Sequence, residues 1–265
     1  MDGKNLHNKK NEDGKYGFVD NEGNWVIEPK FDDAWNFSKG VAKVKFDGKY
    51  GYIKPDGTYL FEPKFDEAEY FKEGIARVEL DDKYGFIKSD GTYLVEPKFD
   101  GARNLSEGFA RVYLDGKYGY IKSDGTLVEP KFDGAEDFCE GFAVVDLDGE
   151  WGYIKSDGSY LVEPEFDDAY DFCEGFARVY VDGQWGYIKS DGTYLVEPKF
   201  DDAEDFSEGF ARVKLDGKWG YIKSDGTFLV EPKFDDAEDF WEGVAEIKLD
   251  GKEGTITIDG TINID

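Results

Sequence analysis

Short apolar runs alternate with polar turns along the whole chain, and one stretch, Lys83–Asp115, shows the pattern clearly. Three segments in it are typical of β-strands: Tyr84–Lys88, Thr92–Glu96 and Phe109–Leu114. We expect Pro97 to end the second strand, because proline has no N–H to donate to a strand ladder. The pattern predicts a three-stranded antiparallel unit.

The turns fix how these strands connect. Asp115-Gly116 lies between two apolar runs, and Asp-Gly favours a type I′ hairpin with positive φ at both central residues. The third strand of one repeat should therefore form a hairpin with the first strand of the next.

Alternation assigns faces to the third strand. Ala110, Val112 and Leu114 should point into a core, whereas Arg111 and Tyr113 should point away from it. Comparing repeats within the chain extends this prediction, because positions that vary in charge are expected to face solvent. The varying positions next to the inward alanine are Lys43, Arg77, Arg111, Val144, Arg178, Arg212 and Glu246.

A connector joins the second strand to the third. In one copy Phe65, Ala68 and Phe71 lie three residues apart, which is the spacing that aligns side chains on a 3₁₀ turn. We expect a short helical turn here that covers the end of the sheet.

An aromatic-glycine pair recurs at steps of 34, 34, 34, 33, 34, 34 and 34 residues, ending in the degraded copy Glu253-Gly254. Gly85 shares a strand face with Ile87, so it should let a backbone or an aromatic ring approach closely, at a bulge. We predict that these pairs pack the repeats: Tyr16-Gly17, Tyr50-Gly51, Tyr84-Gly85, Tyr118-Gly119, Trp151-Gly152, Trp185-Gly186 and Trp219-Gly220.

A fixed period of this length is the signature of a tandem array. We predict an all-β fold of eight three-stranded antiparallel units of about 34 residues, arranged as an open, superhelical solenoid, with a closed propeller-like ring as the alternative. Residues 1–14 would form a polar N-terminal cap, 15–252 seven repeats, and 253–265 a truncated eighth repeat acting as the C-terminal cap.

Phrases such as KWGYIKSDGTFLVEPKFDDAEDFWEG resemble the WG, or KWG, β-repeat family. The resemblance covers essentially the whole chain, although tyrosine replaces tryptophan in the first four repeats. It implies a β-rich array that serves as an interaction module, with no family-wide catalytic residues or cofactor.

Composition narrows the function. Acidic residues outnumber basic ones 60 to 32, for a formal charge of −28, which disfavours direct binding to nucleic-acid phosphates and favours a basic partner. No apolar stretch is long enough to span a membrane, and the start lacks a signal peptide. The localisation is cytoplasmic by default, unless a targeting segment lies outside this sequence.

Groups suited to catalysis are scarce. The single histidine, His7, lies in the polar cap, so no serine or cysteine has a partner of the usual kind. Cys139 and Cys173 occupy one repeat position that tolerates other residues, and their pairing stays open. Acidic pairs such as Asp32-Asp33 recur in several repeats, which indicates solvated connectors. We expect no enzyme, no cofactor and no metal site.

Aromatic residues at variable positions are the candidate interaction surface. They interrupt an acidic row and can serve as interface anchors or sugar platforms, or pack into the next repeat. They are Trp35, Tyr70, Tyr170, Trp241, Tyr113 and Tyr180.

We therefore expect a non-catalytic scaffold for protein–protein interaction. The alternative is a structural protein that self-assembles into a filament or layer, including a consensus-built repeat. Carbohydrate binding and mimicry of a nucleic acid are further possibilities.

Overall fold

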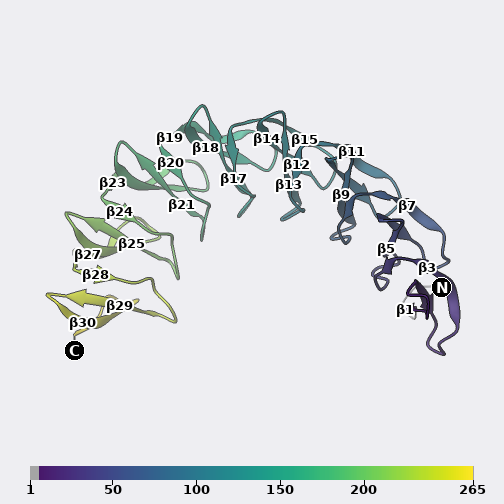
Figure 1. Ribbon diagram of the computed structural model, residues 1–265. Coiled ribbons are helices and arrows are strands. Elements are labelled where there is room, and N and C mark those ends of the chain that lie inside the picture. Colours follow the sequence, from purple (N-terminus) through teal and green to yellow (C-terminus); the bar gives the residue numbers. More distant parts are fainter. Residues whose placement is uncertain (1–5, 265) are drawn as a thin grey trace. The chain divides into compact units, whose positions relative to one another are not determined.

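The computed structural model describes residues 6–264, which form 31 strands and no helix. The ends of the two predicted caps, residues 1–5 and 265, lie outside the described residues. The chain divides into two compact units, Met1–Pro130 and Lys131–Asp265. Within each unit, successive small sheets follow one another along the chain (Figure 1).

The strands of the first unit are β1 (His7–Lys10), β2 (Tyr16–Val19), β3 (Trp25–Phe31), β4 (Asp33–Ala34), β5 (Ala42–Phe46), β6 (Lys49–Ile53), β7 (Tyr59–Phe65), β8 (Glu67–Ala68), β9 (Ile75–Leu80), β10 (Lys83–Lys88), β11 (Tyr93–Phe99), β12 (Gly101–Ala102), β13 (Phe109–Leu114) and β14 (Lys117–Lys122). Strand β15 (Leu127–Phe132) contains the boundary between the units.

The strands of the second unit are β16 (Gly134–Ala135), β17 (Phe142–Leu147), β18 (Glu150–Lys155), β19 (Tyr160–Phe166), β20 (Asp168–Ala169), β21 (Phe176–Val181), β22 (Gln184–Lys189), β23 (Tyr194–Phe200), β24 (Asp202–Ala203), β25 (Phe210–Leu215), β26 (Lys218–Lys223), β27 (Phe228–Phe234), β28 (Asp236–Ala237), β29 (Val244–Leu249), β30 (Lys252–Thr257) and β31 (Ile262–Ile264).

Each sheet combines strands from two consecutive sequence repeats. In the sheet β8-β9-β10-β11, the end of one repeat supplies β8 and β9, and the next repeat supplies β10 and β11. The first sheet has three strands, β1-β2-β3, and the other sheets have four. This confirms the predicted all-β fold of antiparallel repeats. The arrangement as a solenoid or a ring stays a prediction.

The Asp-Gly turns have the conformation that the sequence predicts. Asp115 and Gly116 have φ values of 50° and 85°, both in the left-handed region that a type I′ hairpin requires. A second turn of this kind, which the sequence analysis missed, precedes each third strand. Glu73 and Gly74 have φ values of 52° and 84° between the bridged residues Lys72 and Ile75.

The prediction that Pro97 ends the second strand is wrong. Strand β11 continues to Phe99, which pairs with Tyr84, while Val95 pairs with Phe86. Between these two pairs, three residues of β11 (Glu96, Pro97 and Lys98) oppose the single residue Gly85 of β10, so Pro97 lies inside a bulge. Proline is tolerated there because a bulge leaves residues outside the ladder.

The glycine of each aromatic-Gly pair lies against this bulge. A Cβ added at Gly85 would lie 2.5 Å from Pro97 N and 2.8 Å from Glu96 C. At the seven such glycines the closest backbone atom would lie 2.4 to 2.7 Å from the added Cβ. No other residue type fits at this approach without a backbone shift.

The predicted 3₁₀ turn is also wrong, because the connector forms a short edge strand. Strand β8 pairs Glu67 with Glu79 and Ala68 with Val78. The N–H groups of Asp66 and Glu69 donate to Glu79 O at 2.9 Å and Arg77 O at 3.0 Å. These bonds to the third strand satisfy the connector backbone, which a helical turn would leave facing away from the sheet.

The sheets have an apolar core on both faces. Ala76, Val78 and Ile87 pack with residues of the preceding sheet, such as Phe65. Phe86 and Phe99, with other residues of the same sheet, pack with the following one. Stacking of this kind covers both faces of the sheet β8-β9-β10-β11.

The prediction that positions of variable charge face solvent is wrong where another sheet stacks on that face. Ala110 and Val112 are buried as predicted, but Val144 is only 2% exposed and the side chain of Arg178 only 15%. At Val144 and Arg178 the position therefore lies between sheets, because the next sheet covers it, whereas Glu246 is exposed as predicted.

Four core tyrosines also join consecutive sheets. Their hydroxyls donate to connector carbonyls of the next sheet: Tyr153 to Tyr170 O at 2.7 Å, Tyr187 to Glu204 O and Tyr221 to Glu238 O at 2.6 Å each, and Tyr52 to Glu69 O. Burial raises the pKa of each of these hydroxyls, because the phenolate would lose its hydration.

We predict that Gly85→Ala lowers the free energy of unfolding by about 1–3 kcal/mol or more, the usual cost of overpacking, since its Cβ would meet backbone atoms. Urea unfolding followed by tryptophan fluorescence measures this. Gly101→Ala is the matched control, because its Cβ would meet only Tyr113 Cβ at 3.5 Å. Equal losses in the two variants would contradict a special requirement at Gly85.

We predict that the protein loses stability above pH 10, and that Tyr187→Phe reduces this loss. The folded-state pKa of Tyr187 is raised, so its contribution is complete below pH 10 and falls as the unfolded chain ionises. Each such tyrosine contributes a slope of up to about 1.4 kcal/mol per pH unit.

Unfolding in urea between pH 8 and pH 11.5 measures this slope. At neutral pH the same variant should lose about 1 kcal/mol, because the Glu204 carbonyl loses its donor. Phe86, fully buried at the equivalent position of another repeat, shows that the site accepts phenylalanine. An unchanged alkaline slope in the variant would contradict the prediction.

Candidate functional site: the short-strand edge

Five of the six predicted interaction residues lie along one edge of the sheets. Trp35 and Tyr170 directly follow the two-residue strands β4 and β20, and Tyr70 lies two residues after β8. Tyr113 and Tyr180 lie on the strands that pair with β12 and β20. We call this the short-strand edge: the two-residue strands, the residues that follow them and the residues paired with them. Trp241 lies apart, in the turn before β29, and is 77% exposed.

In the first unit the aromatic residues of this edge surround a lysine. Lys43 Nζ lies 4.4 Å from the ring centre of Trp35, 4.3 Å from that of Tyr70 and 5.3 Å from that of Tyr50. It also donates to Ala68 O at 3.0 Å, in the next sheet. Burial lowers the pKa of Lys43, while the carboxylates of Glu69 and Asp33 oppose that shift. The edge thus forms an aromatic cage filled by a cation of the chain itself.

The second unit repeats the arrangement with arginine. Arg178 Cζ lies 4.0 Å from the ring centre of Tyr170 and 5.4 Å from that of Trp185. Its Nη1 donates to Ala203 O at 2.7 Å and to Glu204 Oε2 at 3.0 Å, both in the next sheet. Tyr180 packs on Trp185 with ring centres 4.8 Å apart.

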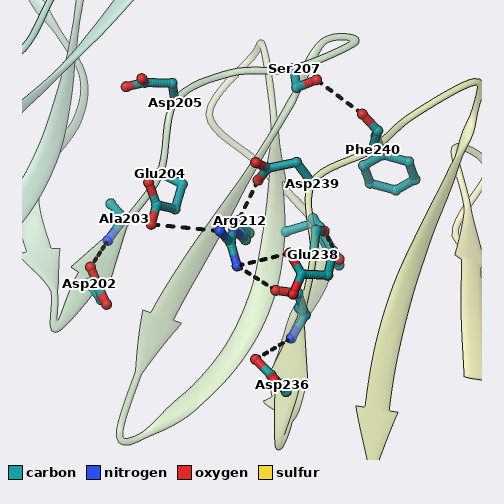
Figure 2. Close-up of polar contacts among 12 residues, drawn as sticks. Asp202, Ala203, Glu204, Asp205, Ser207, Arg212, Asp236, Glu238, Asp239 and Phe240 are labelled. Carbon is teal, nitrogen blue, oxygen red and sulfur yellow. Dashed lines mark hydrogen bonds and ion pairs between the residues drawn. The ribbon is translucent and has the colours of Figure 1, made fainter. Parts of the chain in front are cut away.

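Figure 2 shows the next copy, in which Arg212 lies among carboxylates from two consecutive sheets. Its Nη1 donates to Ala237 O at 2.6 Å. Its Nε lies 2.9 Å from Asp239 Oδ1, an ion pair outside hydrogen-bond geometry, and Nη2 lies 3.7 Å from Glu204 Oε1. The arginine therefore joins two sheets through a backbone carbonyl and carboxylates.

The sequence pattern did not predict that these cations join consecutive sheets; it placed them on the solvent face. The available signal was their recurrence, since a basic residue occupies the position in five of seven repeats of an acidic chain: Lys43, Arg77, Arg111, Arg178 and Arg212. Val144 and Glu246 interrupt the row.

The edge also has a negative field. Partial burial raises the pKa of the Tyr70 hydroxyl, and the Asp33 and Glu69 carboxylates raise it further. Tyr70 is 53% exposed and Tyr170 is 38% exposed. Aromatic rings and carboxylates are both groups that interact favourably with cations.

The paired aspartates of the connectors make bonds within the fold. Asp235 accepts from Lys218 Nζ at 2.5 Å and from Gly251 N at 2.8 Å, and Asp236 accepts from Ala237 N at 3.0 Å. Among residues 6–264 no group of three histidine, cysteine, aspartate or glutamate side chains could hold a metal ion.

The other candidate groups have structural surroundings. Cys139 and Cys173 are not joined in a disulfide, and each Sγ donates to a carbonyl of the next sheet: Cys139 to Phe172 O at 3.4 Å and Cys173 to Phe206 O at 3.2 Å. The position is less neutral than predicted, because Ser207 Oγ makes the same bond to Phe240 O at 3.0 Å (Figure 2). His7 Nε2 lies on the exposed strand β1, 3.2 Å from Asn21 Oδ1.

No helix in the described part of the chain is long and apolar enough to cross a membrane. Among curated proteins, none matches the sequence. Solved structures with a similar course of the chain share little sequence with it. The Hsv2 protein of Kluyveromyces lactis has 10% identity and a TM-score of 0.35, over 88% of this chain and 96% of that one. A eukaryotic initiation factor has 10% identity and a TM-score of 0.42, over 99% and 85%.

The sequence itself matches one family model seven times in succession. The model describes the WG containing repeat, and its matches cover residues 16–50, 50–84, 84–118, 118–151, 151–185, 185–219 and 219–252. They extend over most of the chain and follow the aromatic-glycine stride. The chain therefore belongs to the WG repeat family.

Proposed function

We propose that the protein is a non-catalytic scaffold whose short-strand edge binds a basic segment of another protein. The main support for this proposal is the environment of the Lys43 and Arg178 side chains. At both places the edge holds a cation between aromatic rings, beside a carbonyl of the next sheet. The exposed parts of Tyr70 and Tyr170 offer the same chemistry to a cation from outside.

The charge of the chain supports a basic partner. A formal charge of −28 would speed the approach of a basic segment and would oppose nucleic-acid phosphates. The repeats would let several lysine or arginine side chains bind at once, so that weak contacts add up along the edge. We assign no catalytic role to any residue.

We predict that the protein binds a fluorescein-labelled nona-arginine peptide, and that Tyr70→Ala and Tyr170→Ala each weaken binding about two- to fivefold, the value of one exposed cation–π contact. Fluorescence anisotropy at 50 mM and 300 mM salt measures the affinity, which should fall at the higher salt.

Trp241→Ser is the matched control for this experiment, because it removes an exposed aromatic residue that lies off the edge. The edge would be excluded as the binding surface if the control weakened binding as much as the tyrosine variants. Absence of binding at 50 mM salt would contradict the proposal.

A second candidate function, self-association, has its own supporting observation. Trp241, Val244 and Ile258 are 77%, 40% and 51% exposed, and they lie together because Ile258 N donates to Gly243 O at 3.3 Å. An exposed apolar cluster of this kind is typical of a surface that pairs with a partner.

If this cluster mediates self-association, sedimentation velocity between 10 μM and 1 mM should show oligomers that Trp241→Ser reduces. Tyr170→Ala is the control, since it lies on the short-strand edge. A single monomeric species over this whole range would contradict self-association.

A further inference from the structure

One cavity of about 490 Å³ lies in the first unit, away from the aromatic rings of the short-strand edge. Its walls include the apolar side chains of Val26, Val41, Leu60 and Pro55. Its polar lining includes Lys39 and Lys54, together with Asp56 and Ser89. The volume is that of a small-molecule site, in which an apolar lining with a few polar groups is usual.

Two smaller side chains help to create the cavity. Val26 stands where the following repeats have leucine, and that leucine packs on the next glycine, as Leu60 does on Gly91. Val41 stands where the next five repeats have isoleucine or phenylalanine. In the second unit the phenylalanines at this position pack on a ring of the next sheet, as Phe176 does on Phe206 with ring centres 4.5 Å apart.

Pro55 removes a hydrogen bond at the rim. At the equivalent position Ser89 N donates to Gly74 O at 2.9 Å, and Ser123 N donates to Gly108 O at 2.8 Å. Proline has no N–H, so Gly40 O cannot receive this bond from Pro55. The two turns that border the cavity are therefore not tied together in this way.

The second unit shows what the turn beside this cavity can bind. The Glu140 carboxylate accepts from Glu174 N at 3.0 Å and from Gly175 N at 2.8 Å. The Glu174 and Glu208 carboxylates make the same paired contacts, at 2.7 to 2.9 Å, to the next turns. Two successive N–H groups in a left-handed turn form a concave site for anions. In this fold the anion is a carboxylate.

The first unit has the N–H pair but carries a lysine in place of the glutamate. Lys39 occupies the position that Glu140 occupies in the second unit. The glutamate at the next equivalent position of the first unit, Glu73, does not make the paired contact, which is seen at Glu140, Glu174 and Glu208. A lysine ammonium cannot accept, and no group among residues 6–264 accepts from these two N–H groups. Gly74 lies next to the cavity wall without lining the cavity itself, because its carbonyl accepts from the N–H of the lining residue Ser89 at 2.9 Å.

We propose that this cavity binds a carboxylate carried on a small apolar group. The apolar group would contact Val26, Val41 and Leu60, and the carboxylate would lie between the Lys39 ammonium and the N–H groups of Glu73 and Gly74. Such a carboxylate belongs either to a free short-chain acid or to the apolar C-terminal residue of a peptide. This site is separate from the short-strand edge and does not depend on the function proposed for that edge.

Calorimetric titration with defined probes tests the proposal. Hexanoate represents the free acid and 1-hexanol its neutral counterpart; acetyl-Gly-Gly-Leu represents a C-terminus and its C-terminal amide the neutral counterpart. At least one carboxylate should bind about tenfold or more tightly than its neutral counterpart. Hexanoate alone would identify a free acid, and the peptide alone would identify a C-terminus.

Lys39→Glu should weaken carboxylate binding about tenfold or more, because it reverses the charge and supplies the glutamate of the other repeats. That variant carries the residue found in six other repeats, so it should fold. The combined change Val26→Leu and Val41→Phe should also abolish binding by filling the cavity. Lys98→Glu, on an exposed position of β11, is the control for charge alone.

Three results would each overturn the proposal. They are no binding of either carboxylate, equal binding of acids and neutral counterparts, and equal losses in Lys39→Glu and Lys98→Glu. The peptide test of the short-strand edge uses a cationic probe and other variants, so the two proposals can fail separately.

Discussion

In each repeat the backbone of the aromatic-glycine strand approaches the bulge of the next strand closely, and the rest of the repeat depends on this contact. The bulge at the Glu-Pro pair leaves no room for a Cβ on the strand beside it, so glycine is required there. The bulge also turns the strand so that Phe99 pairs with Tyr84 beyond the proline. The connector and the short edge strand follow from that position, and with them the carbonyls that the cations reach.

An inner sheet such as β8-β9-β10-β11 is covered on both faces, so the residues that a position tolerates depend on how deeply it is buried. The fully buried tyrosine or phenylalanine of the first strand varies only by a hydroxyl, as Phe86 and Tyr187 show. At the position of Lys43 and Arg178, by contrast, different repeats have lysine, arginine, valine or glutamate. Aromatic rings and backbone carbonyls near this position interact with either basic side chain. The buried residues therefore preserve the structure of the repeat, whereas residues of the edge and the turns can change and acquire binding properties.

The sequence predicted the three main strands and their hairpins, since alternation and Asp-Gly turns are local signals. It did not predict the course of the chain at Pro97 or the short strand Glu67–Ala68, because both depend on hydrogen bonds that the neighbouring strand supplies. The assignment of Arg178 to solvent failed for a similar reason. One strand shows two faces, but only stacking decides whether the second face meets water or another sheet.

The two units show how small changes separate a structural role from a binding role at one turn. In the second unit Glu140, Glu174 and Glu208 occupy the N–H pairs of successive turns, so these groups serve the fold. At the start of the chain Lys39 replaces the glutamate, and Val26, Val41 and Pro55 change the adjoining space at the same time. These four differences exchange an acidic side chain for a basic one and lie around a cavity. Val26 and Val41 are smaller than the residues they replace, and Pro55 lacks the N–H that Ser89 and Ser123 donate. The four residues lie together around one cavity, whose size and positive charge suit a small carboxylate. Ligand binding therefore explains their occurrence in one place better than four unrelated substitutions do.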